Sequence, residues 1–300
     1  MAVPSTTLAD LLPSFRRALR AKNLSPRTIA SYDLAAAQLI DHLTAAGHSG
    51  IAAEITRGDL QAFLGHVLET RASATAKQRY ASLRQLFNWL TLEDEIPANP
   101  FDRLTPPRVI EQPIPVLSTI ELRALIAACH GNSFDAKRDE ALIRLFIDSG
   151  IRLGEMAKLS TSDVDLDLEV AVVMGKGRRL RTVPFGKKTT TVLDRYVRAR
   201  RQHRAVTSPA FWLGLKGPLS DSGISQVVLR RGREAGLGRI HPHQFRHTMA
   251  HRWLAAGGSE GDLQRIAGWQ SAHMLARYGR SAADDRAIDA HRRLALGDDL

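Results

Sequence analysis

The sequence predicts a mainly α-helical fold of two domains: an N-terminal helical bundle and a mostly helical second domain that contains a small β-hairpin. Apolar residues recur at helical spacing along most of the chain, and the β-branched run typical of strands is confined to residues 170–185. Six prolines fall within residues 97–115, which indicates an extended linker rather than a helix. We therefore place the domains at residues 1–104 and 118–300, joined by a linker at residues 105–117.

Composition and charge restrict the kinds of function that the chain can have. The net charge of +11 favours a polyanionic partner, most often nucleic acid. This charge is concentrated in residues 108–300, since residues 1–107 are nearly balanced. The one cysteine, Cys129, excludes an internal disulfide and a zinc site built from several cysteines, and it suits a reducing cytoplasm. We expect no signal peptide and no membrane span, because no apolar stretch is long enough.

Four helices are expected in residues 1–104. The first is predicted over residues 8–19, which carry apolar side chains at helical spacing. Ser25 and Pro26 predict the start of the second, because serine caps a helix and proline fits the first helical position. Thr56 and Asp59 form the pattern of a capping box for the third helix. Apolar residues at helical spacing over residues 74–90 predict the fourth.

The second domain is expected to open at Ser118, where a capping box with Glu121 begins a helix. A β-hairpin with a basic tip is predicted at residues 170–185, where two apolar runs flank the turn at residues 175–178. The remaining elements are all helices. They are expected at about residues 119–130, 137–148, 188–204, 222–235, 242–256, 262–267, 272–277 and 283–295.

A short run from His241 to His247 is rich in side chains that bind anions. Pro242 suits the first turn of a helix, and His243 and Arg246 are three residues apart, so they share one helix face. The N-terminus of a helix already favours anions, and a phosphate is the obvious candidate. The alternative on this run alone is a polar helix face in contact with water.

Further segments give this run a context. In chain order they are Ser149-Gly150-Ile151-Arg152-Leu153-Gly154-Glu155, Gly175-Lys176-Gly177, His243-Gln244-Phe245-Arg246-His247, Ala267-Gly268-Trp269 and Tyr278. Because these segments occur in this order and at this spacing, the chain resembles the tyrosine recombinases, also called the phage integrase family. The likeness covers nearly the whole chain, and the run Leu24-Ser25-Pro26-Arg27-Thr28-Ile29 resembles the start of the family's core-binding domain. Trp269 stands where histidine is commoner, and Ser149 where threonine is frequent.

The resemblance implies a fold and an activity. The fold would be a SAM-like core-binding domain followed by a mostly α catalytic domain, in a short Xer-like architecture without an additional arm-binding domain. The activity would be site-specific recombination through a 3′-phosphotyrosine and a Holliday junction. A homotetramer, or a pair with a second recombinase, would act on two double-stranded DNA sites in the cytoplasm, associated with the nucleoid. Relaxation of DNA by a type IB topoisomerase and a catalytically silent DNA-binding regulator are the alternatives.

The resemblance also implies roles for individual residues. Arg152 and Arg246 would clamp the phosphate, Lys176 would protonate the 5′-oxygen, and Tyr278 would be the nucleophile. His243 would assist proton transfer and Trp269 would donate its indole N–H, with Glu155 and His247 supporting these groups from behind. The chemistry agrees, because guanidinium groups hold two phosphate oxygens and phosphoryl transfer depends on positioning and charge. We also expect DNA contacts from Arg27, Lys77, Arg79, Arg84, Arg178, Arg179 and Arg181.

Each of these residues also has a purely structural interpretation. Tyr278 and Trp269 could be packing residues, Arg152 a helix cap and Lys176 a solvated turn residue. His247 and His251 are four apart and could bind zinc, but the glutamate of the H-E-x-x-H motif is missing between them. We expect neither a metal nor another cofactor.

Overall fold

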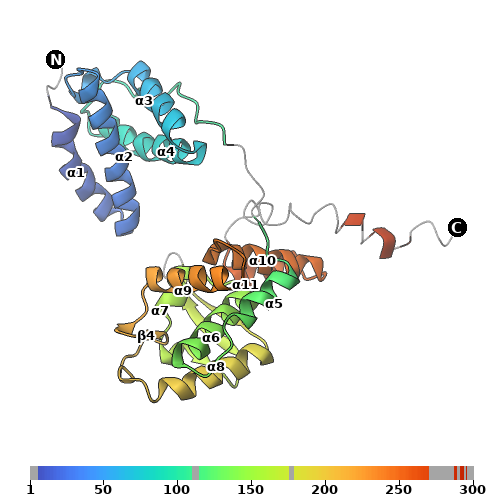
Figure 1. The fold of residues 1–300 in the computed structure, drawn as a ribbon. Helices are drawn as coiled ribbons and strands as arrows, with labels where there is room; N and C mark the ends of the chain where they lie inside the picture. Colours follow the sequence, from blue (N-terminus) through green and yellow to red (C-terminus); the bar gives the residue numbers. More distant parts are fainter. Residues whose placement is uncertain are drawn as a thin grey trace. The chain divides into compact units, whose positions relative to one another are not determined.

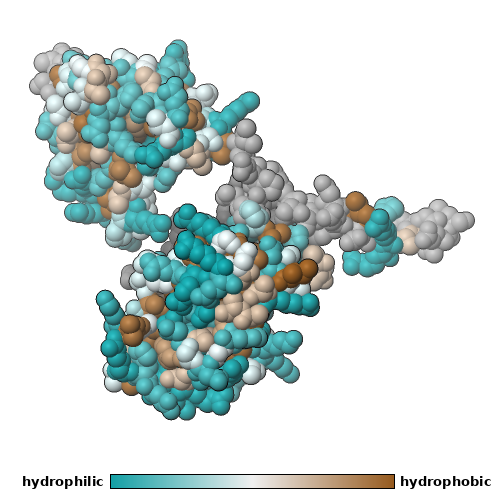
Figure 2. All heavy atoms as spheres, viewed as in Figure 1, coloured by the Kyte–Doolittle hydropathy of each residue, from teal (hydrophilic) through white to brown (hydrophobic). Residues whose placement is uncertain are grey.

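The computed structural model describes residues 6–109, 115–175, 179–269, 287–288, 291–293 and 295. The chain divides into two units, Met1–Gln112 and Pro113–Leu300. Each of them is mainly helical, as the sequence predicts (Figure 1). Hydrophilic residues cover most of the surface that Figure 2 shows, and hydrophobic residues form separate small patches. Within the described residues no helix is both long and apolar enough to cross a membrane.

Over residues 6–109, the described part of the first unit, the chain forms four α-helices, as the sequence predicts. The second and third begin at the expected caps, where Ser25 accepts a hydrogen bond from the Thr28 N–H and Thr56 and Asp59 form a capping box. A 3₁₀ turn, η1, precedes the third helix. The bounds are α1 Leu8–Ala21, α2 Pro26–Ala45, η1 Ala52–Glu54, α3 Arg57–Thr70 and α4 Ser73–Leu92.

All four helices contribute to one apolar core in the first unit. Phe15 of α1, Leu39 of α2, Phe63 of α3 and Phe87 of α4 are almost completely buried in it. The chain beyond α4 is fixed to the same core, because the hydroxyl of the buried Tyr80 donates a 2.5 Å hydrogen bond to the carbonyl of Leu104. Burial of apolar surface is therefore the main force that holds these helices together.

The second unit combines seven α-helices with two small antiparallel sheets within its described residues. The sheets have the strand orders β1-β2-β3 and β4-β5. The helices are α5 Thr119–Ala127, α6 Phe134–Ser149, α7 Leu153–Lys158, α8 Lys187–Arg200, α9 Asp221–Glu234, α10 Pro242–Ala255 and α11 Glu260–Ala267, with the 3₁₀ turn η2 Thr161–Asp163. The strands are β1 Val164–Asp165, β2 Val170–Met174, β3 Leu180–Pro184, β4 Leu213–Gly214 and β5 Gly217–Pro218.

Helix α6 is the central element of the second unit and packs against α5, α8, α9 and α10. Its buried Asp139 accepts hydrogen bonds from three arginines of α6 and α9, at 2.6–2.9 Å. A buried carboxylate requires such partners because its desolvation is costly. These contacts fix α9 against α6. The arginines are Arg138, Arg230 and Arg231.

The predicted β-hairpin is confirmed, with Val172 opposite Thr182 in its register. The sequence does not predict strands β1, β4 and β5, since a two-residue strand has no periodic pattern to detect. Helix α8 ends at Arg200, before the predicted end at residue 204. The guanidinium of Arg200 donates hydrogen bonds to the carbonyls of Val206, Ser208, Ala210 and Phe211, so the chain turns back over the helix end. The helices predicted at 272–277 and 283–295 lie wholly or largely outside the described residues.

Candidate functional site

Arg152 lies at the junction between α6 and α7. Gly150 ends α6 in the left-handed conformation, with a φ of 57°, which favours glycine. The chain then leaves the helix, and Arg152 becomes the N-cap residue of α7. Its guanidinium donates a 2.9 Å hydrogen bond to Oε1 of Glu155 and a 3.0 Å hydrogen bond to the carbonyl of Gly268. With its side chain 34% exposed, Arg152 is held on one side and accessible on the other.

Arg246 approaches the same junction from α10. It is only 1% exposed, and Nη1 of its guanidinium donates a 2.9 Å hydrogen bond to the carbonyl of Gly150. Nη2 of the same guanidinium donates to the carbonyl of Ala267. The helix that carries it begins at Pro242 as predicted, with the Gln244 side chain accepting a 2.8 Å hydrogen bond from the N–H of His241.

The two arginines meet at the end of α11. Arg246 binds the carbonyl of Ala267 and Arg152 binds the next carbonyl, that of Gly268. The following residue is Trp269, which is 6% exposed and has the Arg246 guanidinium above its ring, 5.2 Å from the centroid. This distance is typical of a cation–π interaction. Three segments that are far apart in the sequence therefore place two guanidinium groups and an indole together.

Glu155 and Arg181 support the first arginine. The carboxylate of Glu155 accepts hydrogen bonds from Nη1 and Nη2 of Arg181 at 2.7 and 2.6 Å, and from the N–H of Arg152 at 3.0 Å. Burial alone would raise the pKa of Glu155, but the hydrogen bonds from Arg181 and Arg152 outweigh it and lower the pKa below the usual 4.5. Glu155 therefore stays ionised near neutral pH.

Arg181 also connects the hairpin to α11. Its Nε donates a 3.0 Å hydrogen bond to the carbonyl of Ile266, and its side chain lies against Gly268. A Cβ at Gly268 would lie 3.0 Å from Cδ of Arg181, so glycine allows this close approach. The sequence suggested a DNA contact for Arg181, whereas the structure places its guanidinium against Glu155 with the side chain only 12% exposed. The sequence gives no sign of this pairing, because the partners are far apart in the chain.

The histidines of α10 lie one helical turn apart. His243 is exposed and His247 is buried, with their ring centroids 5.5 Å apart in an edge-on arrangement. This gives His243 access to solvent and places His247 behind it. Within the described part of the chain, no group of three or more histidine, cysteine or acidic side chains is arranged to hold a metal ion.

The other expected site residues divide into three groups. Arg27, Lys77, Arg84 and Arg179 are exposed, whereas Arg79 is buried in the first unit. Lys176, Arg178 and Tyr278 lie outside the described residues. The structure therefore brings together Arg152, Glu155, Arg181, Arg246 and Trp269 and adds the carbonyls of Gly150, Ala267 and Gly268, which sequence reasoning missed.

Two family models match the chain in the order of its two units. The model of the phage integrase family matches residues 115–285, and that of the phage integrase N-terminal SAM-like domain matches residues 11–98. The tyrosine recombinase XerC of Oceanobacillus iheyensis is 30% identical over 258 residues, covering 83% of this chain and 84% of the relative. XerC of Halalkalibacterium halodurans is 28% identical over 284 residues, covering 90% and 92%.

Solved structures share the fold at lower identity. A lambda integrase dimer bound to a COC′ core site matches with a TM-score of 0.74 at 17% identity, covering 91% of this chain and 95% of the other. The integrase of transposon Tn1549 in complex with transposon right end DNA matches with a TM-score of 0.74 at 18% identity, covering 97% and 100%. Because the catalytic-domain model spans more than half of the sequence, the chain belongs to the phage integrase family and is a tyrosine-type site-specific recombinase.

Proposed function

We propose that this recombinase cleaves and rejoins DNA strands at a site centred on Arg152 and Arg246, with Tyr278 as the nucleophile. The observation that carries this proposal is the convergence of the two guanidinium groups on the consecutive carbonyls of Ala267 and Gly268. A phosphate next to them would receive hydrogen bonds from two fixed cations. Charge stabilisation of this kind is the main requirement of phosphoryl transfer.

The neighbours of the arginines support this role. Backbone carbonyls hold part of each guanidinium without neutralising it, since they are dipoles rather than charges. Glu155 is the one carboxylate hydrogen-bonded to Arg152 among the described residues, and it also binds Arg181. One negative charge is thus shared between two cations, which leaves a net positive site for a phosphate.

In the proposed reaction, the Oη of Tyr278 attacks the phosphorus and the bond from phosphorus to the 5′-oxygen breaks. Lys176 protonates the leaving 5′-oxygen, and His243 assists the transfer of the tyrosine proton. The product is a 3′-phosphotyrosine, which a 5′-hydroxyl can attack to restore the strand. Because one phosphoester replaces another, the cycle requires no ATP. Trp269 packs under Arg246 and holds it in place.

The other tyrosines are poorly suited to act as the nucleophile. Tyr80 is buried and donates its hydroxyl hydrogen to Leu104. Tyr196 donates to the carbonyl of Phe211, and burial raises its pKa to about 12, which disfavours the phenolate. Tyr32 lies on α2 of the first unit, packed near Phe15. These facts favour Tyr278 as the nucleophile.

We further propose that residues 1–104 form the domain that binds the core of the DNA site and that residues 118–300 form the catalytic domain, with a linker at 105–117. The two integrases of known structure are described as bound to a core site and to transposon right end DNA. We infer from them that this chain binds double-stranded recombination sites. Four protomers, or two each of this chain and a second recombinase, would act on two sites through a Holliday junction.

The alternatives are less well supported. A silent DNA-binding regulator does not require two guanidinium groups held by carbonyls beside an aromatic ring. Strand relaxation of the topoisomerase type uses related chemistry, but the two XerC relatives described above are tyrosine recombinases.

The test uses a nicked suicide substrate and single-turnover cleavage. Arg152→Ala should lower the rate at least about a hundredfold, since one charge-assisted contact to the transition state is worth roughly 3 kcal/mol. Arg123→Ala, which removes an exposed arginine of α5, is the matched control and should cleave normally.

Cleavage by the unaltered protein should persist in EDTA, because arginines and a lysine supply the charge. Loss of cleavage in EDTA that magnesium or zinc restores would contradict the proposed mechanism. Normal cleavage by Arg152→Ala would show that Arg152 does not take part in the reaction.

A further inference from the structure

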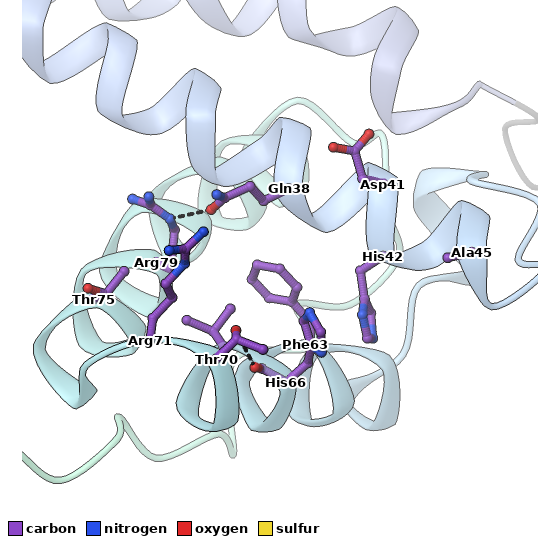
Figure 3. Close-up of a pocket in the computed structure, with 11 residues that line it drawn as sticks. Gln38, Asp41, His42, Ala45, Phe63, His66, Thr70, Arg71, Thr75 and Arg79 are labelled. Atoms are coloured by element: carbon purple, nitrogen blue, oxygen red, sulfur yellow. Dashed lines mark hydrogen bonds between the residues drawn. The ribbon is translucent and has the colours of Figure 1, made fainter.

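The first unit contains a pocket that the proposed reaction does not use. It has a volume of about 530 Å³ and opens between α2, α3 and α4 (Figure 3). This volume lies within the range of pockets that bind small molecules, about 300–1,000 Å³. The lining residues that bear on its chemistry are Gln38, Asp41, His42, Phe63, His66, Arg71 and Arg79.

One end of the pocket carries a buried positive charge. Arg79 is 7% exposed, and Nε of its guanidinium donates a 2.6 Å hydrogen bond to Oε1 of Gln38. Among the described residues it has no carboxylate partner. Burial lowers the pKa of Arg79, but a guanidinium remains protonated at neutral pH. A buried charge without a counterion is costly, so this end of the pocket favours an anion.

A second arginine increases the positive charge at this end. Figure 3 shows the side chains of Arg71 and Arg79 directed to the end of the pocket where Gln38 lies. Arg71 is exposed and forms no ion pair among the described residues. Asp41 is the one carboxylate that lines the pocket, and Figure 3 shows it on the far side of Gln38 from both arginines. Two cations without a nearby carboxylate are suited to hold a phosphate.

The opposite end of the pocket is aromatic. The rings of His42 and His66 lie with centroids 5.5 Å apart, and those of His42 and Phe63 lie 5.6 Å apart. In Figure 3 the ring of Phe63 lies between the histidines and the arginines. The Phe63 ring is only 1% exposed and forms the floor of the pocket, so a flat ring would pack against the accessible rings of His42 and His66, as bases do on aromatic residues.

We propose that this pocket binds a nucleoside monophosphate, with the phosphate on Arg71 and Arg79 and the base against His42 and His66. The pocket is lined by residues of the first unit, whereas Arg152 and Arg246 belong to the second. A bound nucleotide would supply the negative charge that Arg79 lacks and would connect α2, α3 and α4.

The test is calorimetric titration of the full chain with adenosine monophosphate, adenosine and inorganic phosphate, at constant ionic strength. We expect the monophosphate to bind more tightly than the other two compounds, with a stoichiometry of one molecule per chain. Arg79→Gln should weaken its binding about tenfold or more, as expected for the loss of a charge-assisted contact. Arg71→Gln alters an exposed side chain and should also weaken it, so the test remains decisive if Arg79→Gln does not fold.

Two controls separate this site from others that bind phosphate. Arg17→Gln removes an exposed arginine of α1 and should leave binding unchanged. Arg152→Ala should also leave binding unchanged. Loss of binding in that variant would show that the nucleotide binds at the catalytic site, which would overturn the proposal. Equal affinities for the monophosphate and for phosphate alone would show that the aromatic end does not contribute to binding, which would contradict the proposal. If Arg79→Gln and Arg71→Gln weakened the binding of duplex DNA but not of the monophosphate, the arginines would be duplex contacts instead.

Discussion

Arg152 and Arg246 differ in exposure, although both are proposed to hold the same phosphate. Arg246 is almost completely buried by its carbonyl partners and by Trp269, whereas Arg152 has a third of its side chain exposed. A buried guanidinium with fixed partners does not have to reorganise during the reaction, which is how preorganised charge lowers a barrier. The residues that fix the two arginines should therefore affect the rate nearly as much as the arginines themselves.

Trp269 is the residue that packs directly against Arg246. Trp269→Phe keeps a ring under the guanidinium and should retain most of the cleavage rate, whereas Trp269→Ala leaves a cavity and should lose most of it. Aromatic-to-alanine changes in a core cost about 3–5 kcal/mol, and the cation–π contact adds about 0.5–2 kcal/mol. Trp269→His should fall between them. Single-turnover cleavage measures this order, and a Phe variant as slow as Ala beside a nearly normal His variant would show that the indole N–H is essential.

Arg181 is expected to act through Glu155 rather than on DNA. Arg181→Ala should slow cleavage roughly ten- to a hundredfold, because Glu155 and Arg152 lose a fixed position, while DNA affinity changes little. Arg181→Lys should recover only part of the rate, since lysine cannot bind a carboxylate with two parallel hydrogen bonds.

The exposed Arg179 provides the contrast for this experiment. Arg179→Ala should lower DNA affinity and the dependence of binding on salt, with a smaller effect on the cleavage step. Rates and salt-dependent binding are measured for both variants. If Arg181→Ala lowered DNA affinity as Arg179→Ala does and cleaved bound DNA normally, Arg181 would be a DNA contact after all.

At the scale of elements, the site depends on the contact between the end of α6 and α10. Gly150 has a left-handed φ, and a Cβ there would lie 2.6 Å from Cε of Met249. Gly150→Ala should therefore destabilise the second unit by about 1–2 kcal/mol, chiefly through the left-handed backbone, because the flexible end of Met249 can move aside. Urea unfolding monitored by circular dichroism measures the loss, and Gly65→Ala, where a Cβ has space, is the control. An unchanged free energy of unfolding would show that the junction adapts without cost.

The elements that sequence reasoning located well are those with local signals. Ser25, Thr56 and Ser118 cap their helices as predicted, because a capping side chain bonds to residues only a few positions away. The end of α8 was misplaced because four carbonyls beyond it bind Arg200. Strands β1, β4 and β5 were missed because two residues show no pattern.

The same limit applies to the site. The sequence placed Arg152, Glu155 and Arg246 near a common function because each lies in a recognisable motif. It could not pair Arg181 with Glu155, since partners on β3 and α7 are brought together only by the fold. Nor could it identify the carbonyls of Ala267 and Gly268 as partners, because every residue has a carbonyl and only geometry selects two of them.

At the scale of the whole molecule, the distribution of charge follows the proposed division of roles. Of the net charge of +11, +10 lies in residues 108–300, which include the two arginines of the site. A basic catalytic domain would bind the DNA backbone without regard to sequence, and this binding should weaken as salt rises. The nearly neutral first domain would contribute less to that general attraction.

The central claim is that Tyr278 becomes covalently attached to a DNA 3′-phosphate. The most direct measurement is mass spectrometry of peptides from a complex trapped on a nicked suicide substrate. We predict that the unaltered protein gives a peptide with the oligonucleotide on Tyr278, and that Tyr278→Phe binds the same DNA but yields no covalent product. A covalent product with Tyr278→Phe, or attachment at another residue of the unaltered protein, would contradict the claim.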